Sequence, residues 1–572
     1  MLRSLLLACA LFLSSVSAVL SQSTEEEGLR VGTSASGMQG AVAAGGGEAV
    51  AIGLEILKKG GNAADSAAAT ILALSVTDSK EFCFGGEVPI LIYDARRQVV
   101  EVICGMGVAP KLATREYFVQ KAGGLLTPKS RDADEPGGIP PKGIDPAATP
   151  AVLGSCLTVL NRYGTMRFED VAMPTIRILD RQALDWHARL ATTFRRLVSA
   201  EKGSPNDRTR GLRLVDDYFY RGPIAREISA WSEANGGLLR YSDLATHVTR
   251  IEEPASVDYR GYTVYKCGPW TQGPYVLQSL RLLEGFDLKS MGHNRPQTIH
   301  AVIEAMKLAL ADRDVYYADP LFAEVPLAGL LSQSYANLRR PLIDMEKASL
   351  LQRPGDPRAG LPLLAEMEVR RGLGGPNRDT TTCVVADRWG NMVAATPSGW
   401  HGVEAGETGI WLGTRLQSFN LWEGHPNCIE AGKRPRITLT PTLVVRGNKP
   451  TLAVSIAGGD GQDQAGLQLL LNHIDFDLDP VASLAAVRFS TNHHLGSFRQ
   501  TPPELGTLLI SPEIGDAAWA DLAARGHIMR DAGSVATPVV IRIDTATGRM
   551  DTAGDTRTSK DDPRSSRHAA AF

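Results

Sequence analysis

Hydrophobic positions follow two different spacings along the chain. In the first part, apolar residues recur mostly at helical spacing, which predicts helices over residues 48–59, 63–76, 151–163, 224–235, 276–283 and 298–310. Two short β-type stretches predict a hairpin over 89–93 and 99–103. From residue 380 onward, β-branched runs predict strands over 380–385, 392–396, 442–445 and 452–456, and a helix pair follows over 465–473 and 482–488. This order of helices and strands indicates a layered α/β fold.

Residues 1–18 have the three parts of a signal peptide. Arg3 supplies the positive end, residues 5–13 supply the apolar run, and residues 16–18 supply a cleavage site of small side chains. The apolar run is too short to span a bilayer comfortably, and a retained N-terminal anchor is the alternative. We therefore expect an exported protein, either periplasmic or extracellular.

Composition and charge exclude several classes of function. The 572 residues carry 60 Lys and Arg against 63 Asp and Glu, a net charge of -3. This balance gives no basic field that would hold nucleic acid or an anionic membrane. The cysteines are widely spread and lack the C-x-x-C spacing of a metal or redox site. The sequence also lacks a phosphate-binding loop and a haem or flavin signature, so we expect no cofactor and no metal.

A polar segment that runs into a Thr-rich predicted strand carries the clearest chemical signal. If the bond between Asp379 and Thr380 is cut, Thr380 gains a free α-amine beside its own Oγ. An α-amine has a pKa of about 7.7–8.0, so it can act as a general base near neutrality. The same hydroxyl can first attack the carbonyl of Asp379, which would cut the chain without a protease. Taken alone, a Thr-rich stretch is more often only a strand, because β-branched residues suit a pleated sheet.

From about residue 30 to its end, the chain resembles the γ-glutamyltransferase (glutathione hydrolase) family of N-terminal nucleophile hydrolases. The similar segments occur in the family's order, at residues 53–65, 162–166, 258–262, 311–313, 319–320, 406–410, 432–435 and 458–459. The resemblance implies a four-layer αββα sandwich. It also implies self-cleavage into a large subunit, residues 19–379, and a small subunit, residues 380–572, which remain associated. It places the nucleophile at Thr380 rather than at Thr381 or Thr382.

The resemblance assigns further catalytic residues. Ser398 lies where the family has a second hydroxyl that hydrogen-bonds the active threonine, although a serine in a turn is the simpler interpretation of the local sequence. Gly458 and Gly459 lie between an apolar strand and a helix, where backbone amides can approach an oxyanion; an ordinary turn is the alternative. We expect His493 and His494 to lie on the surface rather than to bind a metal.

The residues that would hold a γ-glutamyl head group depart from the family pattern. The segment 104–110, where the family has an arginine for the substrate's carboxylate, contains no basic residue. Thr438 stands at the place of a serine pair, and Ser418 stands at the place of an aspartate that holds the substrate's α-amine. We therefore treat Thr438 and Ser418 as candidate substrate-binding residues, with Arg415 or Arg436 as possible substitutes for the missing arginine.

Segments 268–274 and 425–428 look closer to a divergent branch that is similar to the oxamate amidohydrolases. The function implied by the resemblance is an autoprocessing amide hydrolase or acyltransferase that cleaves γ-glutamyl amides such as glutathione through a threonyl acyl-enzyme. One alternative is an amidohydrolase of a small amide without a glutamyl group. Another is a catalytically silent binding protein of the same fold. In each case the partner is a small-molecule amide, and the oligomeric state stays open.

Overall fold

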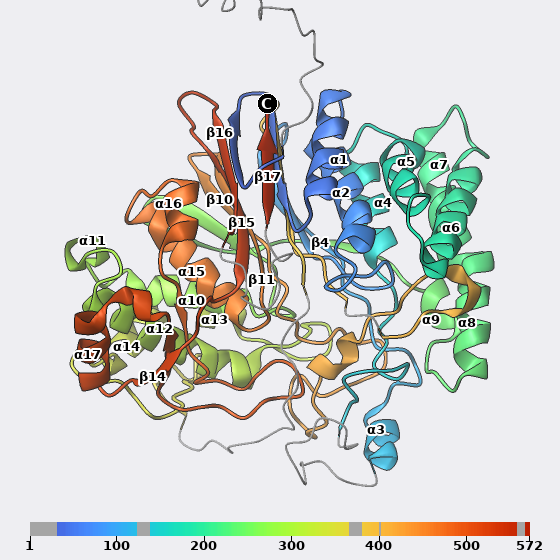
Figure 1. Ribbon diagram of the computed structural model, residues 1–572. Helices are drawn as coiled ribbons and strands as arrows, with labels where there is room; N and C mark the ends of the chain where they lie inside the picture. Colours follow the sequence, from blue (N-terminus) through green and yellow to red (C-terminus); the bar gives the residue numbers. More distant parts are fainter. Residues whose placement is uncertain (1–30, 123–137, 365–379, 400–401, 557–566) are drawn as a thin grey trace, which may run out of the picture.

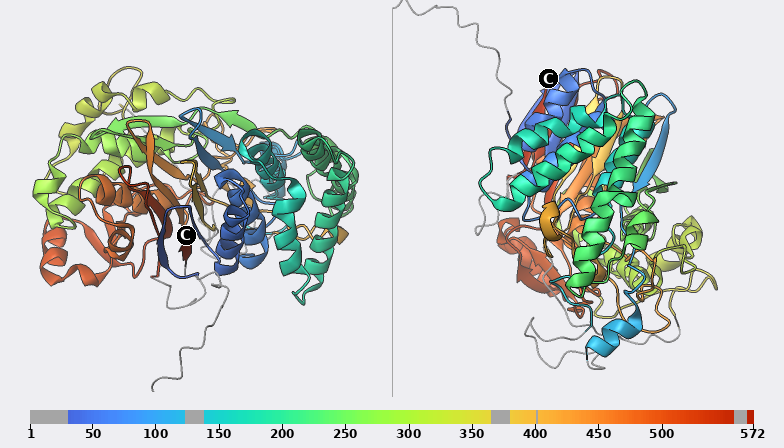
Figure 2. Two further views of the ribbon diagram at one scale, coloured as in Figure 1. Left: turned by 90° about the horizontal axis from the view of Figure 1, so that it is seen from above. Right: turned by 90° about the vertical axis from the view of Figure 1, so that its right-hand side faces the viewer.

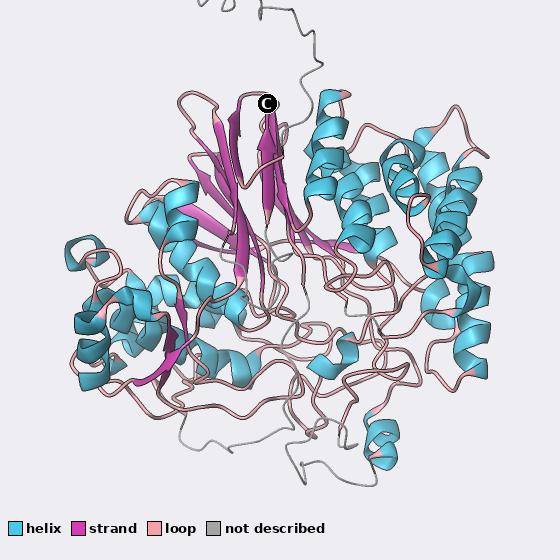
Figure 3. Cartoon of the chain, viewed as in Figure 1, coloured by secondary structure: helices cyan, strands magenta, loops and turns pink. Residues whose placement is uncertain are grey.

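The computed structural model describes residues 31–122, 138–364, 380–399, 402–556 and 567–572. The predicted signal peptide and Asp379 lie outside these ranges. Two seven-stranded antiparallel sheets lie face to face in the middle of the molecule (Figure 1). Helices cover the outer face of each sheet, so that helices, sheet, sheet and helices form four layers (Figures 2 and 3). The predicted αββα sandwich is therefore confirmed.

Each sheet is built from strands that are far apart in the sequence. The first sheet has the order β17 (His568–Ala571), β2 (Gly40–Ala44), β8 (Cys383–Asp387), β9 (Met392–Ala395), β3 (Ile90–Asp94), β4 (Val99–Cys104) and β5 (Arg250–Glu252). The second has the order β1 (Ser34–Gly37), β16 (Met550–Gly554), β15 (Thr537–Ile543), β11 (Lys449–Ala457), β10 (Thr442–Arg446), β7 (Tyr262–Lys266) and β6 (Ala255–Tyr259). A small third sheet contains β12 (Phe489–Ser490), β13 (Thr507–Ile510) and β14 (Ile528–Asp531).

The helices form two groups, one on each side of the sheets. The group on the first sheet comprises α1 (Gly47–Lys58), α2 (Ala63–Thr77), α4 (Val152–Tyr163), α5 (Phe168–Leu179), α6 (Asp185–Glu201), α7 (Arg208–Asp216), α8 (Pro223–Ala234) and α9 (Tyr241–Ala245). The group on the second sheet comprises α10 (Pro274–Leu283), α11 (Leu288–Met291), α12 (Pro296–Tyr316), α13 (Leu327–Leu330), α14 (Gln333–Arg339), α15 (Gly461–Ile474), α16 (Pro480–Ala485) and α17 (Asp516–Ala524). The short α3 (Arg115–Lys121) lies apart from both (Figure 1).

Strand residues alternate between two hydrophobic cores, because successive side chains of a strand point to opposite faces. In β8, Val384 packs between the two sheets, whereas Cys383 and Val385 pack on the side of the helix α2. In β10, Leu443 points between the sheets and Val444 points toward the helices of the second sheet. Both faces of the central strands are therefore buried, which explains why these segments are almost wholly apolar.

The structure confirms the predicted helices and strands in place, with ends that differ by up to six residues. Two of these differences have a clear physical reason. The strand predicted from residue 380 begins at Cys383. Thr381 N–H still donates to the Pro397 carbonyl at 2.9 Å, but proline has no N–H to return a bond, so the ladder stops there. The helix predicted over 482–488 ends at Ala485, because the chain becomes extended at Ala486. The strands that were not predicted are β1, β2, β5, β6, β7 and β12 to β17.

Two further properties concern the whole described chain. Its six cysteines are buried thiols rather than disulfides. None of the helices within the described ranges combines the length and the apolar character that are needed to cross a bilayer.

Several histidines are buried in the neutral state. Burial lowers the pKa of His247 and of His473 from 6.5 to about 4, and that of His493 to about 3. Neither ring nitrogen of His473 has a hydrogen-bond partner among the described residues. When the pH falls below 6.5, these histidines become protonated in the unfolded chain before they do in the folded chain. The stability that the neutral histidines contribute is therefore fully present above pH 6.5. It is lost as the pH falls toward the pKa that each histidine has in the folded protein.

We predict that His473→Phe flattens this acid dependence. Phe keeps the edge-to-face contact of the ring with Tyr262 but cannot take up a proton. Between pH 7.5 and pH 4.5 the wild-type protein should lose about 2 kcal/mol more unfolding free energy than the variant, because one pKa unit corresponds to about 1.4 kcal/mol. Denaturation midpoints measured across this range test the prediction. Parallel curves for the two proteins would contradict it.

Candidate active site

Thr380 and Ser398 lie side by side because their strands are neighbours in the sheet. β8 and β9 are antiparallel, with Cys383 opposite Ala395, and continuing this register sets Thr380 opposite Ser398. Their hydroxyl oxygens are 3.5 Å apart, and both side chains are buried. The 18 residues that separate Thr380 and Ser398 in the sequence are therefore the length of the hairpin that brings the two together.

A buried arginine holds Ser398 from the other side. Arg415 Nη2 donates to Ser398 Oγ at 2.6 Å, and Arg415 Nε donates to Glu87 Oε1 at 2.6 Å. Arg415 and Glu87 are 1% and 2% exposed at their side chains, so their charges are paired away from water. Ser398 Oγ thus accepts from the guanidinium and lies 3.5 Å from the Thr380 oxygen. Arg415 therefore acts on Ser398. No pattern in the sequence pointed to its partner Glu87.

Gly458 and Gly459 form a sharp turn between β11 and α15. Their φ angles are +137° and +56°, a region that disfavours residues with a Cβ. A Cβ on Gly458 would lie 2.9 Å from the Cα of Ala536, which leaves no room for a side chain. The turn leads directly into the N-terminus of α15, where the helix dipole favours negative charge. The two glycines predicted as oxyanion donors therefore have a conformational reason to be glycine.

The side chain of Gln462 links this turn to Thr380. One atom of its amide lies 3.3 Å from Thr380 Oγ1 and 3.4 Å from Thr438 Oγ1. The same atom lies 3.0 Å from the Gly459 nitrogen, and the other amide atom lies 2.7 Å from the Ile456 carbonyl oxygen. Thr438, a predicted substrate-binding residue, is therefore close to Thr380. No pattern in the sequence pointed to Gln462.

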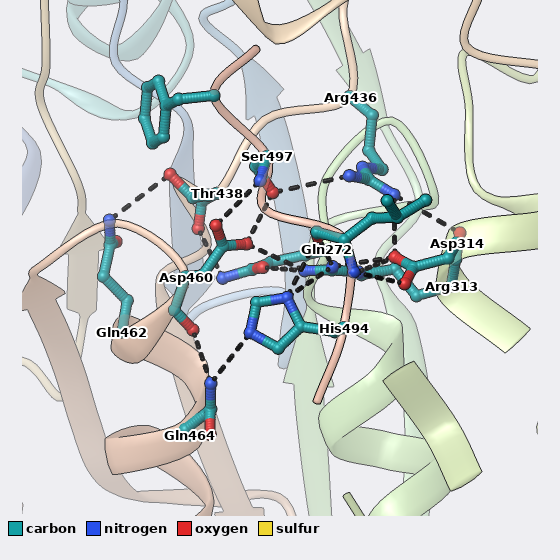
Figure 4. A network of polar contacts seen from close by, with 12 residues as sticks. Gln272, Arg313, Asp314, Arg436, Thr438, Asp460, Gln462, Gln464, His494 and Ser497 are labelled. Carbon is teal, nitrogen blue, oxygen red and sulfur yellow. Dashed lines mark hydrogen bonds and ion pairs between the residues drawn. The ribbon is translucent and has the colours of Figure 1, made fainter. Parts of the chain in front are cut away.

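A buried network of charges fixes Asp460, the residue after the glycines (Figure 4). Asp460 Oδ1 accepts from Arg313 Nη1 at 2.9 Å and from Ser497 Oγ at 2.6 Å, and Asp460 Oδ2 accepts from the Ser497 amide at 2.8 Å. Burial alone would raise the pKa of Asp460, but the guanidinium of Arg313 holds it below its ordinary value. Arg313 also contacts His494 at 3.1 Å. The turn is thus anchored to α12 by an ion pair.

The expectation that His493 and His494 are surface residues is wrong. They are 1% and 4% exposed. His494 lies between Arg313 and Gln464, whereas His493 Nδ1 accepts from the Gly506 amide at 2.8 Å. The polar histidine pair gave no sign of burial because its partners come from distant parts of the chain.

The other proposed substrate contacts occupy different surroundings. Ser418 is buried, and its hydroxyl has no partner among the described residues. Arg436 lies within the network of Figure 4, 3.5 Å from Asp314 and 3.4 Å from Ser497 Oγ. Burial and the nearby Arg313 lower the pKa of Arg436 to about 10. No described group of three or more His, Cys, Asp or Glu side chains is arranged to hold a metal ion.

Known proteins resemble the chain over most of its length. The family model described as Gamma-glutamyltranspeptidase matches residues 49–182 and 182–564. The glutathione hydrolase proenzyme of Escherichia coli (strain K12) is 30% identical over 499 residues, 80% of this chain and 81% of the relative. The acylase ACY 1 proenzyme of Pseudomonas sp. (strain SE83) is 29% identical over 524 residues, 86% of this chain and 88% of the relative.

Two solved structures have a similar fold. The cephalosporin acylase from Bacillus halodurans has a TM-score of 0.76 and 26% identity, covering 97% of this chain and 99% of that structure. A structure named LmbA2991T421A has a TM-score of 0.81 and 29% identity, covering 94% of this chain and 99% of that structure. The resemblance to the oxamate amidohydrolases stays a prediction. The chain belongs to the γ-glutamyltranspeptidase family, and it is an enzyme of that family's amide hydrolase and acyltransferase kind.

Proposed function

We propose that the protein cuts itself between Asp379 and Thr380 and then hydrolyses small amides through an ester on Thr380. The observation that carries the proposal is the position of Thr380 Oγ1. It lies 3.5 Å from Ser398 Oγ. It also contacts one atom of the Gln462 amide, and the backbone nitrogen of Gly459 contacts that same atom. One buried point thus brings together a nucleophile, Thr380, a hydrogen-bond donor to it, Ser398, and an amide for the oxyanion, that of Gly459.

Self-cleavage needs only the groups of this site and one water. Thr380 Oγ attacks the carbonyl carbon of Asp379, and the bond from that carbon to the Thr380 nitrogen breaks as the nitrogen takes a proton. Water then hydrolyses the resulting ester to give a carboxylate at residue 379 and a free α-amine on Thr380. The chain is thereby divided into residues 19–379 and 380–572, after the proposed removal of residues 1–18 during export.

Turnover then repeats the same chemistry on an outside amide. The α-amine of Thr380 takes the hydroxyl proton as Oγ attacks, and it returns the proton to the leaving amine. The amides of Gly458 and Gly459 stabilise the oxyanion, a contribution of about 2.7–4 kcal/mol for one such donor. Ser398, which accepts from Arg415, donates its hydrogen bond to the Thr380 oxygen. Water releases the acid, or an amine acceptor takes the acyl group.

The two proposed fragments have reason to stay together. In the first sheet, β2 of the large fragment lies between β17 and β8 of the small fragment. In the second sheet, β1 and β7 of the large fragment flank four strands of the small fragment. Separation would break backbone ladders in both sheets and expose the core between them, so the fragments should co-purify.

For the substrate, we propose an amide whose acyl group carries no α-ammonium. A γ-glutamyl group carries one, and a carboxylate would be needed to neutralise it in a buried site. At the family's position for that carboxylate stands Ser418, a neutral hydroxyl. γ-Glutamyl amides such as glutathione are the second candidate, favoured by the similarity to the glutathione hydrolase proenzyme of Escherichia coli.

We predict that Thr380→Ala abolishes cleavage of the chain, because it removes the attacking oxygen. Thr380→Ser should still be cut, since serine keeps both Oγ and the future α-amine. Thr382→Ala is the matched control: its hydroxyl is buried nearby without a partner among the described residues, and its loss should leave cleavage intact. Denaturing gels and the N-terminal sequence of the small fragment give the readout. Fragments from Thr380→Ala would point to an outside protease, and an uncut wild type would favour a silent protein.

We predict that glutaryl anilide is hydrolysed faster than γ-glutamyl anilide, two substrates that differ only in the α-amine. Ser418→Asp should reverse the preference by restoring a carboxylate, with a gain of about tenfold or more in relative kcat/KM for the γ-glutamyl compound, as expected for a hydrogen bond between charged groups. Release of aniline is the measurement. A wild-type preference for γ-glutamyl anilide would make glutathione-like substrates the better assignment.

We predict that Asp460→Asn slows cleavage of the chain by at least about tenfold. Asn is neutral, so Asp314 must then pair with both Arg313 and Arg436, and the turn that carries the Gly459 amide loses its ion pair to α12. The unfolding free energy should also fall by about 3 kcal/mol. Glu304→Gln is the matched control, because it breaks another buried ion pair of α12, to Lys307 at 2.7 Å. It should cost similar stability and leave the cleavage rate unchanged. Equal slowing of both variants would show that stability alone matters.

A further inference from the structure

A buried side chain of the protein itself lies beside Thr380 and the Gly459 amide. Gln462 lies in the first turn of α15, is 3% exposed and points toward Thr380 rather than toward solvent. Its terminal amide is a primary carboxamide, the same functional group that an amide hydrolase of this family attacks. The chemistry of its hydrogen bonds decides which end of that carboxamide faces the nucleophile.

The oxygen of the Gln462 amide faces the catalytic groups. Hydrogen bonds assign the two ends of an amide. With Nε2 toward Ile456, it donates to a carbonyl oxygen at 2.7 Å, and Oε1 then accepts from the Gly459 amide at 3.0 Å. The opposite orientation, drawn in Figure 4, would set nitrogen against the Gly459 N–H and oxygen against the Ile456 oxygen. Only the first orientation gives both ends a partner.

In this orientation three donors converge on one oxygen. They are the Gly459 amide at 3.0 Å and the hydroxyls of Thr380 and Thr438 at 3.3 Å and 3.4 Å. A substrate carbonyl needs the same surroundings: an oxyanion amide on its oxygen and the nucleophile's hydroxyl close by. The contact to Ile456 adds an acceptor for an amide N–H, which an ester cannot use.

We propose that the Gln462 carboxamide is a resident substrate mimic: it occupies the carbonyl-binding position and must leave before an amide can react there. The proposal rests on Thr380 being the nucleophile. It also narrows the substrate class, because the site that Gln462 fills selects an amide that keeps an N–H for the Ile456 carbonyl. The first amide that must displace Gln462 is the bond between residues 379 and 380.

A resident occupant lowers the effective affinity of the site for any competitor. Only the fraction of molecules with Gln462 displaced can bind the reacting carbonyl, and the observed affinity falls by that fraction. One net hydrogen bond changes such an equilibrium about fivefold. Removal of the carboxamide should therefore speed the reaction, whereas removal of a merely structural side chain should slow it or leave it unchanged.

The test follows cleavage of the full chain during cell-free synthesis, with acetamide as the probe. Gln462→Ala should be cut about five- to tenfold faster than the wild type. Acetamide, the fragment that this substitution removes, should slow the cleavage of Gln462→Ala and raise its melting temperature, with no effect on the wild type. N,N-Dimethylacetamide, which has no N–H for Ile456, should have no effect on either. Gln462→Met, of similar length but without a carboxamide, is used if the alanine variant does not fold.

Gln468→Ala is the matched control. Gln468 is a buried glutamine of the same helix that bonds the backbone of Phe489, and its loss should produce neither faster cleavage nor sensitivity to acetamide. Slower cleavage of the Gln462 variants, or insensitivity of both to acetamide, would overturn the proposal while leaving Thr380 as the nucleophile. Cleavage in Thr380→Ala would instead overturn the proposed function itself, so the two failures are distinguishable.

Discussion

The antiparallel pairing of β8 with β9 is the constraint on which the site depends. It sets Thr380 opposite Ser398, and it does so at the end of the ladder, where Pro397 returns no hydrogen bond. The sheet around it fixes this end from both sides, because β2 pairs with β8 and β3 pairs with β9. Both faces of β8 pack into hydrophobic cores, so a register shift would turn apolar side chains away from their own layer. The geometry of the two hydroxyls is thus secured by the whole sandwich.

Buried ion pairs complete the site at two points that the sheet does not reach. Arg415 and Glu87 hold Ser398, while Arg313 and Asp460 hold the glycine turn. Such pairs add little net stability, because desolvation offsets most of their attraction, but breaking one leaves a buried charge at a cost of about 3–5 kcal/mol. The ion pairs therefore act mainly by keeping Ser398 and the glycine turn in one position. This suits an oxyanion site, whose donors must be in place before charge develops.

The sequence predicted the parts of this site that local patterns encode. Helical spacing and β-branched runs located most elements, and the family resemblance located Thr380, Ser398, Gly458 and Gly459. What the sequence did not reveal are contacts between distant segments: Glu87 and Arg415 are 328 residues apart, and Arg313 and Asp460 are 147 apart. For the same reason His494 was expected on the surface. The Ala- and Gly-rich β2 was missed because its composition is not typical of a strand, and only its burial between β17 and β8 makes it one.

The occupied oxyanion position follows from the same physical requirements. A buried backbone N–H without a partner costs about 1–3 kcal/mol, and an enclosed site offers little water to satisfy it. Before an amide arrives, the Gly459 amide would be such a group, and Gln462 removes the penalty. A tighter occupant would block the reaction, whereas a neutral side chain held by a few net bonds of about 1 kcal/mol each can be displaced. A carboxamide satisfies both demands because it has the shape and the polarity of the substrate amide and carries no charge.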